Sequence, residues 1–250
     1  MKRGRSTMRL LRAFAICGMA VLTFVSLAWT EDRWDEIKRV DNAASVLNEI
    51  MKTPDKGIPD DVMKNAVCVA VVPSLKKAGF VFGGEYGKGV ASCHGTNGWS
   101  APAPFTVAGG TWGLQIGGEA VDLVLLVMND KGMEALLSSK FKLGADASVA
   151  AGPVGRQAEG DTDWRMKAEV LTYSRARGIF AGVTVNGAVI AQDHDATRAF
   201  YGHDDSFRSI LSGQVAAPTA SAPFLEALKR FSAQAKTAQA NTNQSQPARQ

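Results

Sequence analysis

The sequence predicts an α+β fold in which a strongly curved antiparallel sheet, or partial barrel, is flanked by helices. Three observations lead to this fold class. A helical apolar pattern covers residues 32–52, short β-branched segments follow as far as residue 192, and many of the 25 glycines lie in those segments and their turns. Glycine in a strand marks a bulge, a bend or a close backbone approach, so we expect strong curvature.

The helix over residues 32–52 repeats apolar side chains at steps of three and four, which suits docking on a core. The alternative is a helix lying on a membrane surface, but that needs a basic polar face, and this segment is mixed in charge. Further helices are expected over residues 58–65, 129–139, 195–201, 204–211 and 221–233.

Short alternating or β-branched segments predict the strands. Asn186-Gly187, a strong hairpin signal, should join two of them. Residues 83–89 are expected to form a glycine-rich turn, because their spacing fits no phosphate-binding loop. The expected strands cover residues 66–72, 80–82, 88–92, 111–116, 120–128, 164–174, 178–185 and 188–192.

The first 28 residues have the composition of an export signal. Five basic residues and no acidic ones precede Ala13, and an apolar or small stretch follows to Ala28. Ser26 and Ala28 offer small residues for cleavage. We therefore expect a signal peptide over residues 1–28 and an exported, periplasmic protein that is soluble or peripheral to a membrane. The alternative is a segment retained as an anchor.

Removing residues 1–28 takes away five of the 28 basic residues and none of the 24 acidic ones, which leaves a net charge of −1. Proteins that bind nucleic acid usually show a clear basic excess, so no nucleic-acid partner is expected.

The remaining chain has the size of one domain. We place a single domain over residues 32–211. An Ala/Ser/Gln-rich segment over 212–250 should be disordered apart from the helix over 221–233.

Two cysteines, Cys68 and Cys93, remain after residue 28. An oxidising compartment would allow them to form a disulfide. Two buried thiols are the alternative, since Cys68 lies in an apolar strand.

No residue pattern predicts a catalytic or metal site. Asp193-His194-Asp195 lacks the paired histidine spacing of zinc sites and should be a surface or capping cluster. Ser92-Cys93-His94 lacks the surroundings of a known nucleophile. We expect no enzyme activity, no cofactor and no metal.

Basic residues beside turns are the remaining candidates for ligand contact, because such residues bind phosphate through charge-assisted hydrogen bonds. They are Lys76, Lys77, Arg156, Arg175 and Arg177. Aromatic residues suit apolar or interfacial contact with a membrane. The aromatic candidates are Phe80, Trp99 and Trp112.

Seven stretches, in order, together resemble the SYLF domain. They are Ala66–Pro73 with Lys77-Ala78-Gly79-Phe80, then Gly83–Gly89, Gly98–Pro102, Gly113–Gly117, Ala151–Arg156, Tyr173–Arg175 with Gly178–Val183, and Asp195–Gly202. The resemblance covers residues 38–204.

The resemblance implies lipid binding, notably of phosphoinositides in eukaryotic members, with actin association in some. It also implies a curved antiparallel sheet with flanking helices. We therefore expect an exported, non-enzymatic protein that binds anionic phospholipid or phosphoinositide-like headgroups at a membrane surface. The alternative is a cell-envelope module that binds a protein partner without specific lipid recognition.

Overall fold

The computed structural model describes residues 33–50, 52, 58–79, 82–112, 117–153, 167–176, 179–182 and 185–244. The predicted signal peptide lies outside these ranges.

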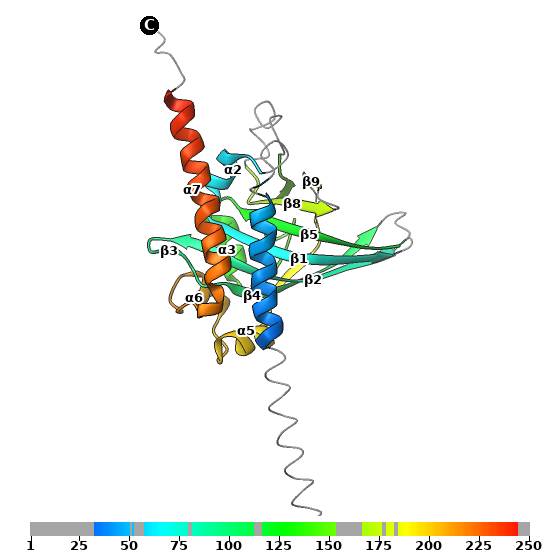
Figure 1. Ribbon diagram of the computed structural model, residues 1–250. Helices are drawn as coiled ribbons and strands as arrows, with labels where there is room; N and C mark the ends of the chain where they lie inside the picture. Colours follow the sequence, from blue (N-terminus) through cyan, green and yellow to red (C-terminus); the bar gives the residue numbers. More distant parts are fainter. Residues whose placement is uncertain are drawn as a thin grey trace, which may run out of the picture.

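A ten-stranded sheet curls into a half-barrel with helices on its outer face (Figure 1). The strand order is β6-β10-β4-β2-β1-β5-β8-β7, with β3 added to β2 and β9 to β8. Neighbours are antiparallel except β7 and β8, which are parallel. The predicted α+β class and strong curvature are therefore confirmed. The strands are β1 (Cys68–Gly79), β2 (Phe82–Gly95), β3 (Gly98–Trp99), β4 (Ala103–Trp112), β5 (Gly117–Val127), β6 (Lys140–Lys142), β7 (Val149–Ala151), β8 (Val170–Ala176), β9 (Ile179–Gly182) and β10 (Val189–Gln192).

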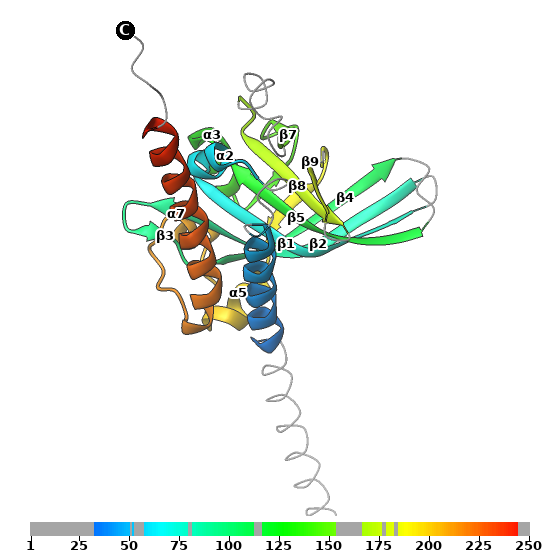
Figure 2. The same cartoon turned by 45° about the horizontal axis from the view of Figure 1, so that its top comes forward.

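Three helices cover the outer face of the curl. They are the N-terminal helix over residues 33–50, α2 (Asp60–Asn65) and α7 (Ala222–Gln244). Figures 1 and 2 show the N-terminal helix and α7 side by side across the strands. Leu47 and Phe224, both buried, belong to one apolar cluster with Val71 of β1 and Val124 of β5.

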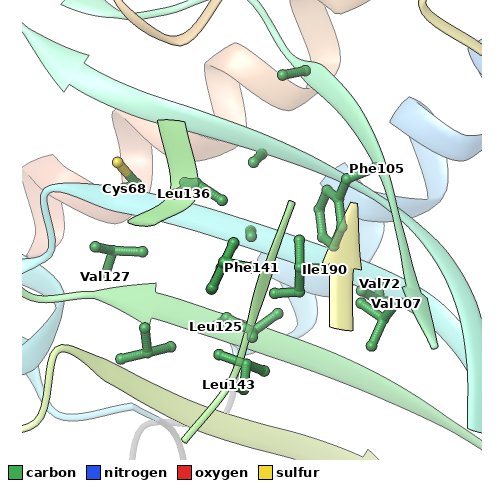
Figure 3. Packing of buried hydrophobic residues seen from close by; sticks show 14 of the residues in the cluster. Cys68, Val72, Phe105, Val107, Leu125, Val127, Leu136, Phe141, Leu143 and Ile190 are labelled. Atoms are coloured by element: carbon green, nitrogen blue, oxygen red, sulfur yellow. The ribbon is translucent and has the colours of Figure 1, made fainter. Parts of the chain in front are cut away.

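The inside of the curl holds a second apolar cluster. Figure 3 shows Phe105, Phe141 and Ile190 pointing toward Leu125 across the interior. Buried residues of α3 (Asp130–Leu137) and α6 (Phe207–Leu211) belong to the same cluster. The remaining helices are α5 (His194–Tyr201) and a short 3₁₀ turn, η2 (Thr219–Ser221). Two cores, one on each side of a single sheet, hold the fold together.

The expectation of a glycine-rich turn at residues 83–89 is wrong, because these residues lie inside β2. A Cβ added to Gly87 would lie 2.5 Å from Val72 Cγ1, and one added to Gly89 would lie 2.5 Å from the Val71 carbonyl oxygen. On the inner face of the sheet, β2 therefore lies so close to β1 that a residue with a Cβ atom would clash at these two positions. The glycines permit curvature within a strand.

Strand β1 also continues beyond the predicted end at residue 72. Pro73 and Ser74 form an irregularity where the register shifts between Val72 and Leu75. The Ser74 backbone N–H donates to Asp122 Oδ1 at 3.0 Å. A bulge tolerates a proline that a regular ladder would exclude, so the strand resumes at Leu75.

Asn186-Gly187 forms a turn, with Gly187 at φ 87°, but the predicted hairpin is wrong. β9 pairs with β8, whereas β10 pairs with β4 and β6. The local turn signal is present, and long-range pairing determines which strands become neighbours.

Cys68 and Cys93 are direct partners on β1 and β2, with Cα atoms 4.0 Å apart, and they form a disulfide. The sequence left open a disulfide or two buried thiols, and the structure contains the disulfide.

The C-terminal segment differs from its prediction. α7 runs to Gln244 instead of ending at residue 233. The expectation of disorder after residue 233 is therefore wrong as far as residue 244. Phe224, Leu228 and Phe231 are fully buried in the outer cluster, which makes α7 part of the domain. Its apolar face was visible in the sequence, but its packing partners were not.

We predict that Gly89→Ala lowers the free energy of unfolding by about 2 kcal/mol or more, because a methyl group would collide with the Val71 carbonyl oxygen and the Phe105 ring. The matched control is Gly84→Ala in the same strand, where the nearest atom to an added Cβ is 3.8 Å away. Urea unfolding measures both variants. Equal stability of the two would contradict the close-approach role of Gly89.

Candidate functional site

A pocket of about 510 Å³ opens where the start of the N-terminal helix meets β2, β4 and α5. Its lining includes Glu36 from the helix, Tyr86 and Lys88 from β2, and Asp193 and Arg198 at α5. Ligand sites in proteins commonly have this volume. We call this cavity the helix–strand pocket.

Three residues that line the helix–strand pocket belong to a charge cluster around the buried Arg39; they are Glu36, Lys88 and Asp193. Arg39 Nη2 lies 2.7 Å from Glu36 Oε1, and Arg39 Nη1 lies 3.3 Å from Asp193 Oδ2. Lys88 Nζ lies 3.9 Å from the same Asp193 oxygen. Asp193 also caps α5 by accepting a hydrogen bond from the Ala196 N–H at 3.1 Å. The cluster therefore ties the N-terminal helix to α5 and β2. The predicted capping role near residue 193 is confirmed.

Glu36 is the member of this cluster that has a carboxylate oxygen without a hydrogen-bond partner among the described residues. Its side chain is 6% exposed, and its Oε2 atom has no hydrogen-bond partner among the residues that the structure describes. Burial raises the pKa of Glu36 to about 7; Arg39 and Lys88 oppose the rise, while Asp193 and Asp35 add to it. Glu36, which lines the pocket, thus keeps a buried acceptor oxygen without a donor in the part of the chain that the structure describes.

One outer strip of the sheet continues from the pocket. Lys76 of β1 is the register partner of Tyr86 of β2, so both side chains share the outer face. Lys88 lies two residues further along β2, on the same face. Lys76 is exposed, the Lys88 side chain is 53% exposed, and Tyr86 is 49% exposed. The strip places two cations around an exposed aromatic ring.

The neighbouring candidate Lys77 lies on the opposite face of β1 from Lys76. Its Nζ atom lies 3.7 Å from Glu85 Oε2, whose side chain is 5% exposed. This pair is directed toward the interior of the curl, so the structure separates two residues that the sequence had grouped.

Arg175 joins three elements on the outer face. Its Nη2 atom lies 2.8 Å from Asp122 Oδ2 of β5, and its Nη1 atom pairs with Glu49 near the end of the N-terminal helix. The side chain is 23% exposed. Arg175 therefore fastens the helix to β5 and β8 and does not line the helix–strand pocket.

Trp99 also has structural contacts. Its indole N–H donates to Ser232 Oγ of α7 at 3.1 Å, and its ring packs edge-on against His94. Phe80, Arg156 and Arg177 lie outside the described residues, and nothing is described for the side chain of Trp112. Of the four predicted ligand contacts whose side chains the structure describes, Lys76 lies beside Tyr86, a residue of the pocket lining.

Sequence reasoning missed Glu36 and Lys88. Glu36 is four residues before Val40, and Arg39 is four before Ala43, so both occupy helical positions next to buried residues. A charged pair on an apolar helix face was the available signal. Lys88 lay where the expected turn over residues 83–89 overlapped the expected strand over residues 88–92, so the face on which its side chain lies was not predicted.

Among the described residues, no helix combines the length and apolar composition of a membrane span.

Comparison with known proteins identifies the family. A family model described as "Ysc84: Las17-binding protein actin regulator" matches residues 108–231. SH3 domain-containing YSC84-like protein 1 of Xenopus laevis is 34% identical over 216 residues, covering 83% of this chain and 64% of that protein. Protein YSC84 of Saccharomyces cerevisiae is 36% identical over 196 residues, covering 75% of this chain and 42% of that protein. The human YSC84-like protein 1 is 35% identical over 196 residues, covering 76% and 57%.

The chain is an α+β domain with a curled sheet and outer helices, and it belongs to the Ysc84, or SYLF, domain family. It spans less than two thirds of the length of these relatives. The description of the family names binding and regulation, not catalysis, which agrees with the expectation of a non-enzymatic role.

The raised pKa of Glu36 predicts a pH dependence of stability. Because folding raises this pKa from 4.5 to about 7, the folded state holds more protons than the unfolded state between these values. The contribution of Glu36 to stability is therefore present below about pH 4.5 and is lost as the pH rises through 7. Glu36→Gln cannot titrate, so its unfolding free energy should fall about 2 kcal/mol less than that of the wild type over this range.

Urea unfolding at about pH 4.5 and about pH 7.5 measures the difference. Glu226→Gln, which changes an exposed acid on α7, is the control and should keep the wild-type slope. The same slope in Glu36→Gln and the wild type would show that Glu36 titrates normally.

Proposed function

We propose that this protein is a non-enzymatic lipid-binding protein that recognises anionic phospholipid or phosphoinositide-like headgroups at a membrane surface. The observation that carries the proposal is the outer strip beside the helix–strand pocket, where Lys76 and Lys88 flank Tyr86. Lysine donates charge-assisted hydrogen bonds to phosphate, and each basic residue near an anionic surface contributes about 1 kcal/mol of binding.

Exposed aromatic side chains support the same face. Among the described residues, the large hydrophobic side chains that are exposed are Trp34, at 58%, and Tyr86, at 49%. Trp34 directly precedes Asp35, which lines the pocket. Tryptophan and tyrosine suit the boundary between headgroups and water because one end is apolar and the other polar. The pocket lining therefore includes one of these aromatic side chains, Tyr86, next to Lys88.

A protein partner is the second candidate function. Relatives are named for binding Las17, and we carry protein binding to this chain as the alternative: a cell-envelope interaction module without specific lipid recognition. Absence of any vesicle binding would favour it.

The double variant Lys76→Glu with Lys88→Glu should weaken binding to phosphatidylglycerol, cardiolipin or phosphoinositide vesicles about tenfold or more, because two attractive charges become repulsive. Co-sedimentation of the purified full chain at low and physiological salt measures this, with phosphatidylcholine vesicles as the uncharged reference. The matched control is Lys167→Glu with Lys229→Glu, which makes the same charge change at exposed residues that do not line the pocket. Equal losses in both double variants would contradict recognition at this site.

We also propose that the protein is exported to the periplasm through cleavage after Ala28. Basic residues followed by an apolar stretch and small residues support this. N-terminal sequencing of the protein from the periplasmic fraction of a Gram-negative host should begin at Trp29. A mature chain that still begins at Met1, or one recovered from the cytoplasm, would refute export by cleavage.

A further inference from the structure

The acidic side of the helix–strand pocket needs an explanation that phosphate binding alone does not provide. Four carboxylates line the pocket against two cations. The carboxylates are those of Asp35, Glu36, Asp193 and Asp195, and the cations are Lys88 and Arg198. Buried Arg39 lies beside Glu36 and Asp193 and offsets part of this negative charge, but a phosphate alone would still enter a site with more carboxylates than cations. The ligand must therefore also bring positive charge to the acidic side.

Glu36 identifies where that positive charge would lie. The carboxylate is buried, its Oε1 atom is engaged by Arg39, and its Oε2 atom has no donor among the described residues. A buried acceptor without a donor is costly, and a ligand N–H group would satisfy it. A quaternary ammonium has no N–H, whereas a primary ammonium has three donors.

The cationic side of the pocket lies toward the sheet. Lys88 Nζ is 3.9 Å from its nearest carboxylate oxygen, beyond hydrogen-bond distance, and its side chain is half exposed. Lys76 and Tyr86 continue that side along the outer strip. An exposed tyrosine ring also attracts a cation through its π face. Lys88 thus brings a cation from the sheet to a pocket that is also lined by carboxylates of the N-terminal helix and of α5.

We propose that the helix–strand pocket binds a primary ammonium group next to a phosphate, with Glu36 Oε2 accepting a hydrogen bond from the ammonium and Lys88 contacting the phosphate. The headgroup of an aminophospholipid carries this pair of charges, and so does free phosphoethanolamine. The inference rests on the proposed function for its lipid source, but the ammonium contact can be tested separately.

Binding should depend on pH in a defined direction. The groups facing Glu36 are Arg39 and Asp35 on its own helix, Asp193 before α5, and Lys88 from β2. An ammonium favours the ionised carboxylate, so affinity should rise as the pH increases from 6 to 8, and binding should release a proton.

The first experiment titrates the full chain with phosphoethanolamine and with phosphocholine by calorimetry. We expect phosphoethanolamine to bind about tenfold more tightly, which is about 1.4 kcal/mol, because phosphocholine offers no N–H to Glu36. Glu36→Gln should abolish the preference, and Glu226→Gln should keep it. Tyr86→Ala, at a half-exposed position, gives a second variant that should weaken both ligands if Glu36→Gln fails to fold. Thermal unfolding of each variant controls for folding.

The second experiment compares vesicles of phosphatidylglycerol mixed with either phosphatidylethanolamine or phosphatidylcholine. A preference for the ethanolamine vesicles that is lost in Glu36→Gln supports both the ammonium contact and the lipid source. Discrimination between the free ligands without vesicle binding supports the ammonium contact and overturns the lipid function. Vesicle binding with no preference in either experiment overturns the ammonium contact and leaves the lipid function standing. No binding in either experiment overturns both.

Discussion

The N-terminal helix is held across the outer face of the sheet by an ionic contact near each end. Near its start, Arg39 lies between Glu36 and Asp193, and near its end Glu49 pairs with Arg175. Buried residues between these points pack on the strands. Burying an arginine is costly unless carboxylates surround it, so the first contact fixes where the helix begins relative to α5. The helix–strand pocket exists because the helix is fixed there.

The same ionic contact leaves one acceptor unused. Arg39 offers its two terminal nitrogens to Glu36 and Asp193, while the second oxygen of Glu36, a residue that lines the pocket, has no hydrogen-bond donor among the described residues. A cluster built only for stability would gain by satisfying every buried oxygen. The proposed ammonium contact would therefore use a carboxylate that also belongs to the cluster holding the N-terminal helix in place.

Local patterns predicted much of the fold and little of the site. Helix periodicity, the alternating strands and the turn at Asn186-Gly187 are properties of short windows, and the structure contains all three. Pairing of β9 with β8 and of β10 with β4 depends on the whole sheet, so the predicted hairpin was wrong. Arg175 appeared to be an exposed cation because its partner Asp122 lies 53 residues away. Lys76 was chosen as a basic residue beside an expected turn, whereas it lies within β1 and reaches the outer strip through its pairing with Tyr86.

The segment Glu85–Gly89 shows how one stretch of strand serves both the fold and the proposed site. Alternation directs Gly87 and Gly89 into the curl, where β1 and Phe105 leave no room for a Cβ. The same alternation directs Tyr86 and Lys88 outward, toward the pocket. A shift of one residue would bury the lysine and expose the glycines. The curvature of the sheet and the chemistry of the outer strip therefore depend on a single register.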